Sequence, residues 1–461
     1  MRAQCPVVTR LALMAAFACL SPSAGAEQRV VPPGEVPLQA MIDQSAEGDT
    51  LVLQGEHHGP IRLTRRLTLQ GEPGAAITGS GEGSVITVVA PGAVVRGFII
   101  TGSGRNLENM DAGVFVEKSA VGAIVEENRI EGNLYGIYLH GAENAVARKN
   151  EIIGIDIGRI NESGNGVSVW NAPGAKVLDN DIRFGRDGIF VIASQRNVFS
   201  GNRFHDLRFA IHYMYTNDSE VSNNISTGNT VGFAIMYSHH LTVRANVSDG
   251  DRDHGLLFNF ANGSEIRGNT VRGRLQPAER WVGSRMDAGE HGVPSSDKAE
   301  LTLGTGARNG PEKCVFIYNA NKNVFRDNWF EGCEIGIHFT AGSEGNEIEN
   351  NAFVNNRNQV KYVGTRYLDW SKSGRGNYWS DNPAFDLDAD GIADTAYRPN
   401  DLVDKVLWTA PQAKVLINSP AMQVIRWAQA QFPALLPGGV VDSHPLISPP
   451  PRPAASGRGP S

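Results

Sequence analysis

The stretch GIFVIASQRNVFSGNRFHDLRFAIHYM, from Gly188 to Met214, carries the same short pattern at both ends. GIFVI and AIHYM each start with a small residue, and the second and fourth residues of each are apolar or aromatic. The two first residues, Gly188 and Ala210, are 22 positions apart. A pattern that returns at a fixed interval of this length is typical of solenoids, in which each repeat forms one coil of a stack.

The same pattern recurs over most of the chain. Further copies begin at Gly113, Gly136, Gly166, Gly232, Gly255, Cys314 and Gly336. Most intervals are 22 or 23 residues, with a longer one after Gly136 and a much longer one after Gly255. Because strand side chains alternate in direction, the second and fourth residues face the core and the third and fifth face outward. The sequence predicts an all-β, right-handed, single-stranded parallel β-helix, the hand expected for parallel crossovers.

A second set of residues repeats in phase with the first. These residues are Asn128, Asn150, Asn180, Asn202, Asn224, Asn246, Asn269, Asn328 and Asn351. Asparagine tolerates the left-handed backbone of a sharp corner. Stacked asparagine amides also form hydrogen bonds along the axis of stacked β-structures. One asparagine per coil therefore supports the same fold independently.

The first 26 residues have the character of a signal peptide. Arg2 and Arg10 are basic, residues 11–20 are apolar but too short to span a bilayer, and residues 23–26 are small. We expect export with cleavage of this signal, which makes Glu27 the first mature residue. An uncleaved N-terminal anchor is the alternative.

The rest of the chain divides into a solenoid and a tail. The predicted parts are a signal peptide at 1–26, the β-helix at 27–362, a C-terminal tail at 363–448 and a disordered tail at 449–461. A helix over residues 36–46 is expected to cap the first coil, since an open end would pair with other chains. A large insertion over about 275–313 has no repeat, and loops of this size are usually functional or mobile.

Charge and cysteine content narrow the functional classes. The chain has 42 basic and 49 acidic residues and no run of Lys and Arg, which argues against a nucleic-acid partner. After removal of the signal peptide, Cys314 and Cys333 are the two remaining cysteines. An even pair in an exported protein suggests a disulfide.

The tail contains an acidic loop that resembles a calcium site. Oxygen ligands fall at positions one, three, five, seven and nine, namely Asp386, Asp388, Asp390, the carbonyl of Ile392 and Asp394. Gly391 stands at the turn position, but position twelve is Tyr397 rather than a bidentate Glu, and Asp401 is the nearest substitute. We expect a structural Ca²⁺ ion here, and a merely acidic turn is the alternative.

The outward positions of the coils are unusually aromatic. They include Tyr138, His140, Trp170, Phe190, His212, Met214, Met236, Phe316, Tyr318 and His338. A solvated strand face should be polar, whereas an exposed apolar strip marks a binding surface. We therefore interpret the strip as a partner-binding surface. A strip covered by the chain's own insertion or C-terminal tail and a sugar-binding groove remain alternatives.

Three residues of the strip have soft donor atoms. Met214 and Met236 are one repeat apart and should stack on neighbouring coils, and His212 is two residues from Met214. Thioether and imidazole ligands suit Cu(I) rather than Ca²⁺ or Mg²⁺. The sequence therefore suggests a Cu(I) site, and plain packing of methionine is the alternative.

A catalytic interpretation has weaker support. Polysaccharide lyases and epimerases with this fold need acids and bases gathered on one outward face. The best candidate is the run from Asp251 to His254, which lies at a coil corner where acidic residues are ordinary. Asp187 shares the phase of His254 but lies three coils away, and no row of Lys or Arg accompanies them. An enzyme acting on uronic-acid polymers is thus the second hypothesis.

Several stretches together resemble the family of the nitrous oxide reductase maturation protein NosD. They are YGIYLHGAENAVARKNEI from Tyr135, GNYWSDNPAFDLDADGIAD from Gly376, NSPAMQVIRWAQAQFP from Asn418 and VVDSHPL from Val440. The resemblance covers about residues 36–446, and the C-terminal stretches are its most specific part.

The resemblance implies a non-enzymatic role in the periplasm. Members of this family assist assembly of the copper–sulfur centre of nitrous oxide reductase. Their partners are an ABC-type ATPase with its membrane permease, a copper chaperone lipoprotein and the apo-reductase. The helix expected from Ser419 to about Gln431 contains Met422 and Trp427 and is more apolar than a free surface helix tolerates. Capping of the last coil and docking on the permease are the two interpretations, and they are compatible.

Overall fold

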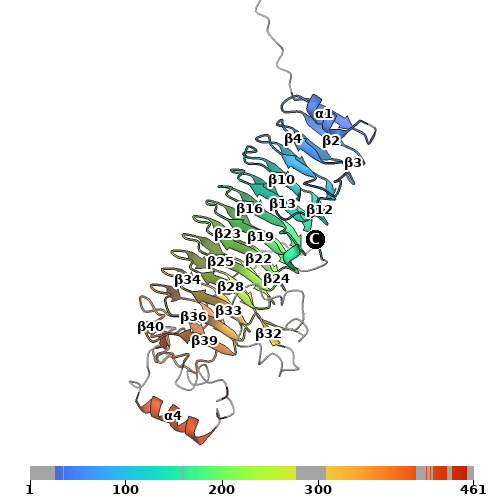
Figure 1. Cartoon of the computed structure of the whole chain (residues 1–461). Helices are drawn as coiled ribbons and strands as arrows, with labels where there is room; N and C mark the ends of the chain where they lie inside the picture. Colours follow the sequence, from blue (N-terminus) through green and yellow to red (C-terminus); the bar gives the residue numbers. More distant parts are fainter. Residues whose placement is uncertain are drawn as a thin grey trace, which may run out of the picture.

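The computed structural model describes residues 26–34, 36–156, 160–276, 308–400, 412, 416, 419–432 and 439–453. Three long parallel sheets wind around one axis, so the chain forms an elongated β-helix with its N-terminal coils at one end (Figure 1). The predicted fold is confirmed. Residues 1–25 of the predicted signal peptide, residues 277–307 of the insertion, Asp401 and residues 454–461 lie outside the described part.

The first sheet has 13 strands. They are β1 (Gln28–Val31), β2 (Thr50–Leu53), β5 (Thr68–Gly71), β8 (Val94–Arg96), β11 (Ile124–Glu126), β14 (Val146–Arg148), β17 (Lys176–Leu178), β20 (Val198–Ser200), β23 (Glu220–Ser222), β26 (Thr242–Arg244), β29 (Glu265–Arg267), β34 (Val324–Arg326) and β37 (Glu347–Glu349).

The second sheet, called here the long-strand sheet, has 12 strands and contains the repeated pattern. They are β4 (Ile61–Leu63), β7 (Ile86–Val88), β10 (Ala112–Val116), β13 (Tyr135–His140), β16 (Val167–Trp170), β19 (Asp187–Ile192), β22 (Phe209–Met214), β25 (Val231–Met236), β28 (His254–Asn259), β33 (Lys313–Tyr318), β36 (Ile335–Thr340) and β39 (Asn358–Val363).

The third sheet again has 13 strands. They are β3 (Glu56–His58), β6 (Ala76–Thr78), β9 (Ile99–Thr101), β12 (Arg129–Glu131), β15 (Glu151–Ile153), β18 (Asp181–Arg183), β21 (Arg203–His205), β24 (Ile225–Thr227), β27 (Val247–Asp249), β30 (Thr270–Arg272), β35 (Trp329–Glu331), β38 (Ala352–Val354) and β41 (Tyr378–Trp379). Because β41 pairs with β38, the solenoid extends beyond the predicted end at residue 362.

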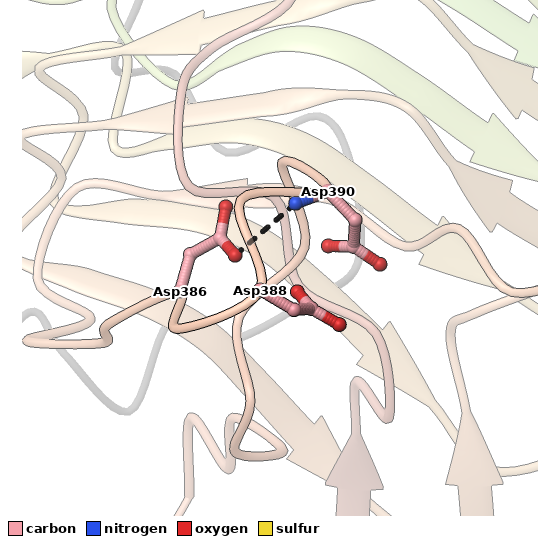
Figure 2. A group of neighbouring side chains, drawn as sticks. All are labelled: Asp386, Asp388 and Asp390. Carbon is pink, nitrogen blue, oxygen red and sulfur yellow. Dashed lines mark hydrogen bonds between the residues drawn. The ribbon is translucent and has the colours of Figure 1, made fainter.

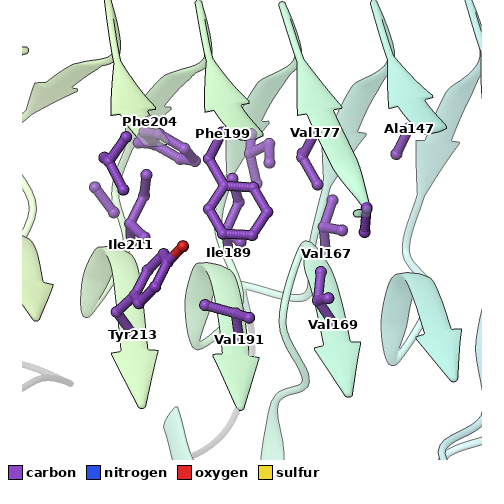
Figure 3. Close-up of a cluster of buried hydrophobic side chains, with 14 of the residues drawn as sticks. Ala147, Val167, Val169, Val177, Ile189, Val191, Phe199, Phe204, Ile211 and Tyr213 are labelled. Carbon is purple, nitrogen blue, oxygen red and sulfur yellow. The ribbon is translucent and has the colours of Figure 1, made fainter. Parts of the chain in front are cut away.

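Coil stacking follows the predicted register. Ile189 pairs with Ile211 and Val191 with Tyr213, and all four side chains are buried. Figure 3 shows these residues in rows that run along the axis, where each residue lies next to its equivalent in the neighbouring coil. The core is therefore one continuous column of Ile, Val, Phe and Ala rather than a set of separate clusters.

The asparagine ladder is present, although its corner role was wrong. Asn150 Oδ1 accepts hydrogen bonds from both the backbone N and the Nδ2 of Asn128, and Asn150 Nδ2 bonds in turn to Asn180. The ladder continues as far as Asn377. The left-handed corner residue is the one before each asparagine, such as Lys149 with φ 54°. Asparagine is needed here for its amide, which links coils through buried hydrogen bonds.

The ends and the insertion differ from plain coils. Helix α1 (Leu38–Gln44) begins inside the predicted 36–46 range and buries Leu38 and Ile42 against the first coils. The insertion leaves the solenoid as a two-stranded antiparallel ribbon of β31 (Arg274–Gln276) and β32 (Arg308–Gly310). A 3-10 turn, η1 (Ile160–Glu162), lies in the longer interval that follows Gly136. The repeat resumes at β33.

The tail adds two further elements. β40 (Tyr367–Asp369) pairs with β42 (Gly439–Val441), and α4 (Pro420–Gln431) lies at the C-terminal end of the solenoid (Figure 1). Arg452 pairs with Glu331 and lies over the Trp329 ring at 5.0 Å, so the first residues of the predicted disordered tail are ordered against the coils.

None of the helices in the described part of the chain is long and apolar enough to span a bilayer.

Candidate functional site

The outer face of the long-strand sheet carries two rows of side chains that run along the axis. One row includes Tyr138, Phe190, His212, Ala234, Phe316 and His338, and the other includes His140, Trp170, Met214, Met236, Asn259 and Tyr318. We call these two rows the outer strip. The register places them side by side as predicted, whereas their exposure varies from coil to coil.

The N-terminal part of the outer strip is a set of stacked rings. His140 stacks on Trp170 with ring centroids 4.5 Å apart, and Phe115 stacks on Tyr138 at 5.5 Å. Trp170 is 40% exposed, and the other rings are partly buried. Burial raises the pKa of Tyr138 to about 12, so its hydroxyl keeps its proton. This part of the strip is a pre-ordered aromatic surface of the kind found at protein interfaces.

The middle of the outer strip is buried, which corrects the expectation of a continuously exposed strip. Phe209, Val231 and Ala234 form a small apolar cluster outside the main core, with Met236 and Leu257 packed against it. Phe209 and Val231 stand at the first position of their strands, and strict alternation would place them inside. The chain breaks alternation at the following small residue, so the first residue joins the outer face.

The two methionines of the predicted Cu(I) site are brought together. Met214 pairs with Met236 across neighbouring strands β22 and β25, at a strand spacing of about 4.8 Å. Both side chains are partly buried. His212 lies on the same face two residues before Met214, about 7 Å along the strand. Methionine side chains are long and flexible, so their thioethers are candidate ligands on this face.

A buried charged cluster holds His212. Asp187 Oδ2 lies 3.1 Å from His212 Nδ1, and the Nε and Nη2 of Arg208 donate to the two oxygens of Asp187 at 2.8 and 2.7 Å. Burial acts to raise the pKa of Asp187, but the Arg208 charge and the hydrogen bonds outweigh it and hold that pKa well below its ordinary value. These three residues could not be grouped from the sequence, since their contacts depend on the coil register.

His338 belongs to a second group of histidines further along the outer strip. The Phe316 ring lies 5.0 Å from His338 and 5.4 Å from His254. Burial, reinforced by the charges of Lys313 and Lys361, lowers the pKa of His338 to about 3. Burial also lowers the pKa of His254 well below its ordinary value. Both imidazoles are therefore neutral at physiological pH.

The residues of the catalytic hypothesis have other roles in the structure. Asp251 is fully buried and accepts hydrogen bonds from Ser226, Ser248 and the Asn229 backbone, which makes it a corner residue. Asp253 is hydrogen-bonded to Arg252, and burial raises its pKa.

Asp187 and His254 share a register position three coils apart, as expected. Lys313 lies next to His254 in register and Lys361 next to His338, but the two lysines stand at different positions of their strands and do not line up as a row.

An aromatic ladder beside the methionines was missed. Tyr215, Tyr237 and Phe260 follow the last residues of β22, β25 and β28, and their rings stack at 5.0 and 5.1 Å. All three have left-handed backbones, with φ of 47°, 49° and 51°. This conformation is rare for bulky residues. An aromatic residue at one constant offset in three successive repeats was the signal that could have revealed the ladder.

The acidic loop has the shape of a cation site in part (Figure 2). Oxygens of Asp386, Asp388 and Asp390 lie within 4.8 Å of one another. The charge of Asp390 raises the pKa of Asp388, whereas the hydrogen bond from the Gly391 backbone lowers that of Asp386. Gly391 has φ 86°, a left-handed turn that glycine adopts without strain.

The remaining predicted ligands of the loop are less favourable. Asp394 Oδ2 accepts a hydrogen bond from the Leu387 backbone, and the backbone N of Ile392 donates to Asp390. Tyr397, at position twelve, directs its hydroxyl to Asp381 at 2.7 Å, and its ring packs on Trp379 at 4.9 Å. Position twelve therefore supports the tail fold instead of completing the loop.

Two further predicted features lie near the C-terminal end. Cys314 and Cys333 are fully buried and form a disulfide, with Cα atoms 5.7 Å apart. In α4, Ser419 caps the helix by accepting a hydrogen bond from the Met422 backbone. Met422 is buried, but Trp427 is 63% exposed, so the helix presents an apolar side chain to solvent.

Comparison with known proteins agrees with this architecture. Residues 148–384 match the family model described as periplasmic copper-binding protein (NosD). A relative from Stutzerimonas stutzeri, named as a probable ABC transporter binding protein NosD, is 39% identical over 393 residues, which is 85% of each chain. A protein of the same name from Pseudomonas aeruginosa is 38% identical over 93% of this chain and 94% of its own.

Among solved structures, the Dettilon tailspike protein matches 70% of this chain and 63% of its own, with a TM-score of 0.50 and 15% identity. At that identity the likeness concerns the fold alone. The two relatives, by contrast, are identical to this chain at more than a third of the aligned positions, which cover 85% and 93% of it. The chain therefore belongs to the NosD family.

Proposed function

We propose that this chain is a periplasmic Cu(I)-binding scaffold that works with an ABC transporter in maturation of the copper–sulfur centre of nitrous oxide reductase. The family description and the names of the relatives support the copper and transporter parts of this proposal. The observation that carries it is the pairing of Met214 with Met236 in register, next to His212.

The donor set suits Cu(I) as a cargo ion. Two thioethers and one imidazole are soft or intermediate ligands without charge, and they select Cu(I) over Ca²⁺ and Mg²⁺. Partial burial of both methionines and the apolar cluster of Phe209, Val231 and Ala234 beside them limit access of water. A poorly hydrated site of this kind favours a monovalent soft ion, which loses less hydration than a divalent one.

The partners are assigned to different surfaces. We infer that the aromatic N-terminal part of the outer strip, with Tyr138, His140, Trp170 and Phe190, receives the copper chaperone lipoprotein or the apo-reductase. Trp170 is exposed and already stacked on His140, so the pair loses little conformational freedom on binding. The exposed Trp427 of α4 instead suits the permease of the transporter, with the ATPase subunits on the far side of the membrane.

We also propose that Asp386, Asp388 and Asp390 hold a structural Ca²⁺ ion that orders the tail. Their mutual repulsion, visible in the raised pKa of Asp388, is relieved when a cation binds. Asp394 and the Ile392 carbonyl complete the loop only after local rearrangement, because the Asp394 side chain now bonds to the Leu387 backbone.

Titration with Cu(I) under anaerobic conditions, in competition with a chromogenic chelator, tests the copper site. Replacing Met214 and Met236 together by leucine removes both sulfur atoms while keeping side-chain volume. The expected result is a fall in Cu(I) affinity of at least tenfold. Met41→Leu is the matched control, since Met41 is also partly buried but lies in α1. Equal affinity of the double variant and the wild type would remove the proposed site.

A further inference from the structure

Asp187 and His212 form a buried acid–imidazole pair between β19 and β22. Asp187 Oδ2 lies 3.1 Å from His212 Nδ1, and the side chains are 1% and 7% exposed. An ionised carboxylate has no proton to donate, so Nδ1 must be the donor in this hydrogen bond. The lone pair of a neutral His212 is then on Nε2, the nitrogen on the opposite side of the ring.

Arg208 fixes the orientation of the Asp187 carboxylate independently of His212. Its Nε and Nη2 bond to the two oxygens of Asp187 at 2.8 and 2.7 Å, a bidentate geometry that sets the plane of the carboxylate. The guanidinium also lies over the Phe209 ring at 4.8 Å. A buried carboxylate without such a partner would be strongly destabilising. The pair therefore gives His212 a rigid acceptor whose charge is already balanced.

The coil does not need a charged residue at this position. Phe209 and Val231 occupy the same register position as Asp187 in the next two coils, and both are buried apolar residues. An apolar side chain thus completes the same strand without a charged partner. The charged Asp187 stands in the coil directly next to the coil that carries both His212 and Met214.

We propose that Asp187 is a positioning residue, which holds His212 in its Nδ1-protonated form and presents Nε2 to Cu(I) beside Met214 and Met236, with Arg208 holding Asp187. This inference rests on the proposed copper site. Histidines that bind metal commonly donate their second N–H to a carboxylate, and loss of that partner lowers metal affinity by about 10–100-fold. We expect a loss of that size here.

Asp187→Asn tests the inference because it keeps the shape and changes the hydrogen-bonding groups. The asparagine amide can donate to Nδ1, which moves the ring proton to Nε2 and blocks the nitrogen that would bind copper. Protein labelled with ¹⁵N-histidine reports the tautomer of His212 in two-bond ¹⁵N–¹H correlation spectra, with His212→Gln for assignment. The expected result is Nδ1 protonation in the wild type and its loss in Asp187→Asn.

Cu(I) affinity and X-ray absorption of the copper-loaded protein give the second readout. Asp187→Asn should bind Cu(I) about 10–100-fold more weakly and lose the nitrogen scatterer, while the sulfur scatterers remain. Asp181→Asn is the matched control, because Asp181 lies in the same coil and contacts His205 at 3.4 Å on another sheet. Its tautomer signals at His212 and its copper affinity should equal those of the wild type.

The outcomes separate this inference from the proposed function. A wild-type spectrum with the His212 proton on Nε2 overturns the inference even if Asp187→Asn does not fold. Unchanged affinity in a folded Asp187→Asn variant also overturns it, while sulfur scattering from Met214 and Met236 would leave the copper site standing. Absence of Cu(I) binding by the wild type would instead reject the copper site itself, and with it this role of Asp187.

Discussion

Asn202→Ala is the sharpest test of what holds the coils together. The Oδ1 of Asn202 accepts hydrogen bonds from the backbone N and the Nδ2 of Asn180, at 3.0 and 2.9 Å. Its Nδ2 donates to the Val177 carbonyl at 2.8 Å and to Asn224 Oδ1 at 3.0 Å. A fifth, longer hydrogen bond runs from Nδ2 to the Ser200 carbonyl at 3.3 Å. The side chain is fully buried, so alanine leaves a space where five hydrogen bonds were made.

The cost follows from the groups that have no second partner. Asn180 Nδ2 still donates to the Ala147 carbonyl, and Asn224 Oδ1 still accepts from the Asn202 backbone. The Asn180 backbone N loses its partner, whereas the Val177 carbonyl stays in the parallel ladder of β17 and β20. A buried group left unsatisfied costs about 1–3 kcal/mol, so we expect a loss of about 2 kcal/mol in the free energy of local opening.

Hydrogen exchange at the Asn180 amide measures this loss directly, and guanidinium unfolding followed by circular dichroism gives the global effect. Local exchange is preferable because solenoids need not unfold in one step. Lys176→Ala, on an exposed neighbouring position, should change stability by less than about 0.5 kcal/mol. A cost of Asn202→Ala below about 1 kcal/mol would show that the ladder does not stabilise the stack.

Four further predictions follow from the same structure. Replacing Cys314 and Cys333 by serine opens a loop of about 19 residues and should cost about 3 kcal/mol in an unfolding titration; no change would mean that the bond does not form. Since the pKa of His338 is lowered to about 3, the unfolded chain binds an extra proton between about pH 6.5 and 3. Stability should therefore fall as pH decreases in this range, by up to about 1.4 kcal/mol per pH unit, and His338→Leu should flatten the slope. Trp427→Ala should leave the melting temperature unchanged but weaken capture of the transporter permease, and equal capture would exclude α4 as the docking element. Calcium should raise the melting temperature of the wild type more than that of Asp388→Asn, and identical shifts would reject the acidic loop as its site.

The repeat could be predicted from the sequence because one coil equals one period. Gly188 and Ala210 start consecutive coils, and a constant phase is enough to assign Ile189 to the core and Met214 to the outer face. The pairing of Met214 with Met236 could be predicted because the two residues are one repeat apart. Periodicity therefore predicted both the architecture and the neighbours along the axis.

Periodicity could not predict contacts across rows. Arg208 reaches Asp187 because the first residue of each strand turns to the outer face, which breaks the alternation on which the sequence argument depended. The same break buries Ala234 under Phe209 and Val231, so part of the expected exposed strip is closed. These features depend on local backbone geometry at the small residue of each repeat.

The regular stacking of coils also sets the distances between sites along the axis of the molecule. Four strand steps, from β25 through β28, β33 and β36 to β39, separate Met236 from the last coil before the tail. At about 4.8 Å per step, this sets a separation of about 19 Å along the axis. Removing one whole coil between Met236 and the tail would shorten this distance by one step while leaving the side chains at either end unchanged. The number of coils therefore determines how far apart the two ends of this segment lie.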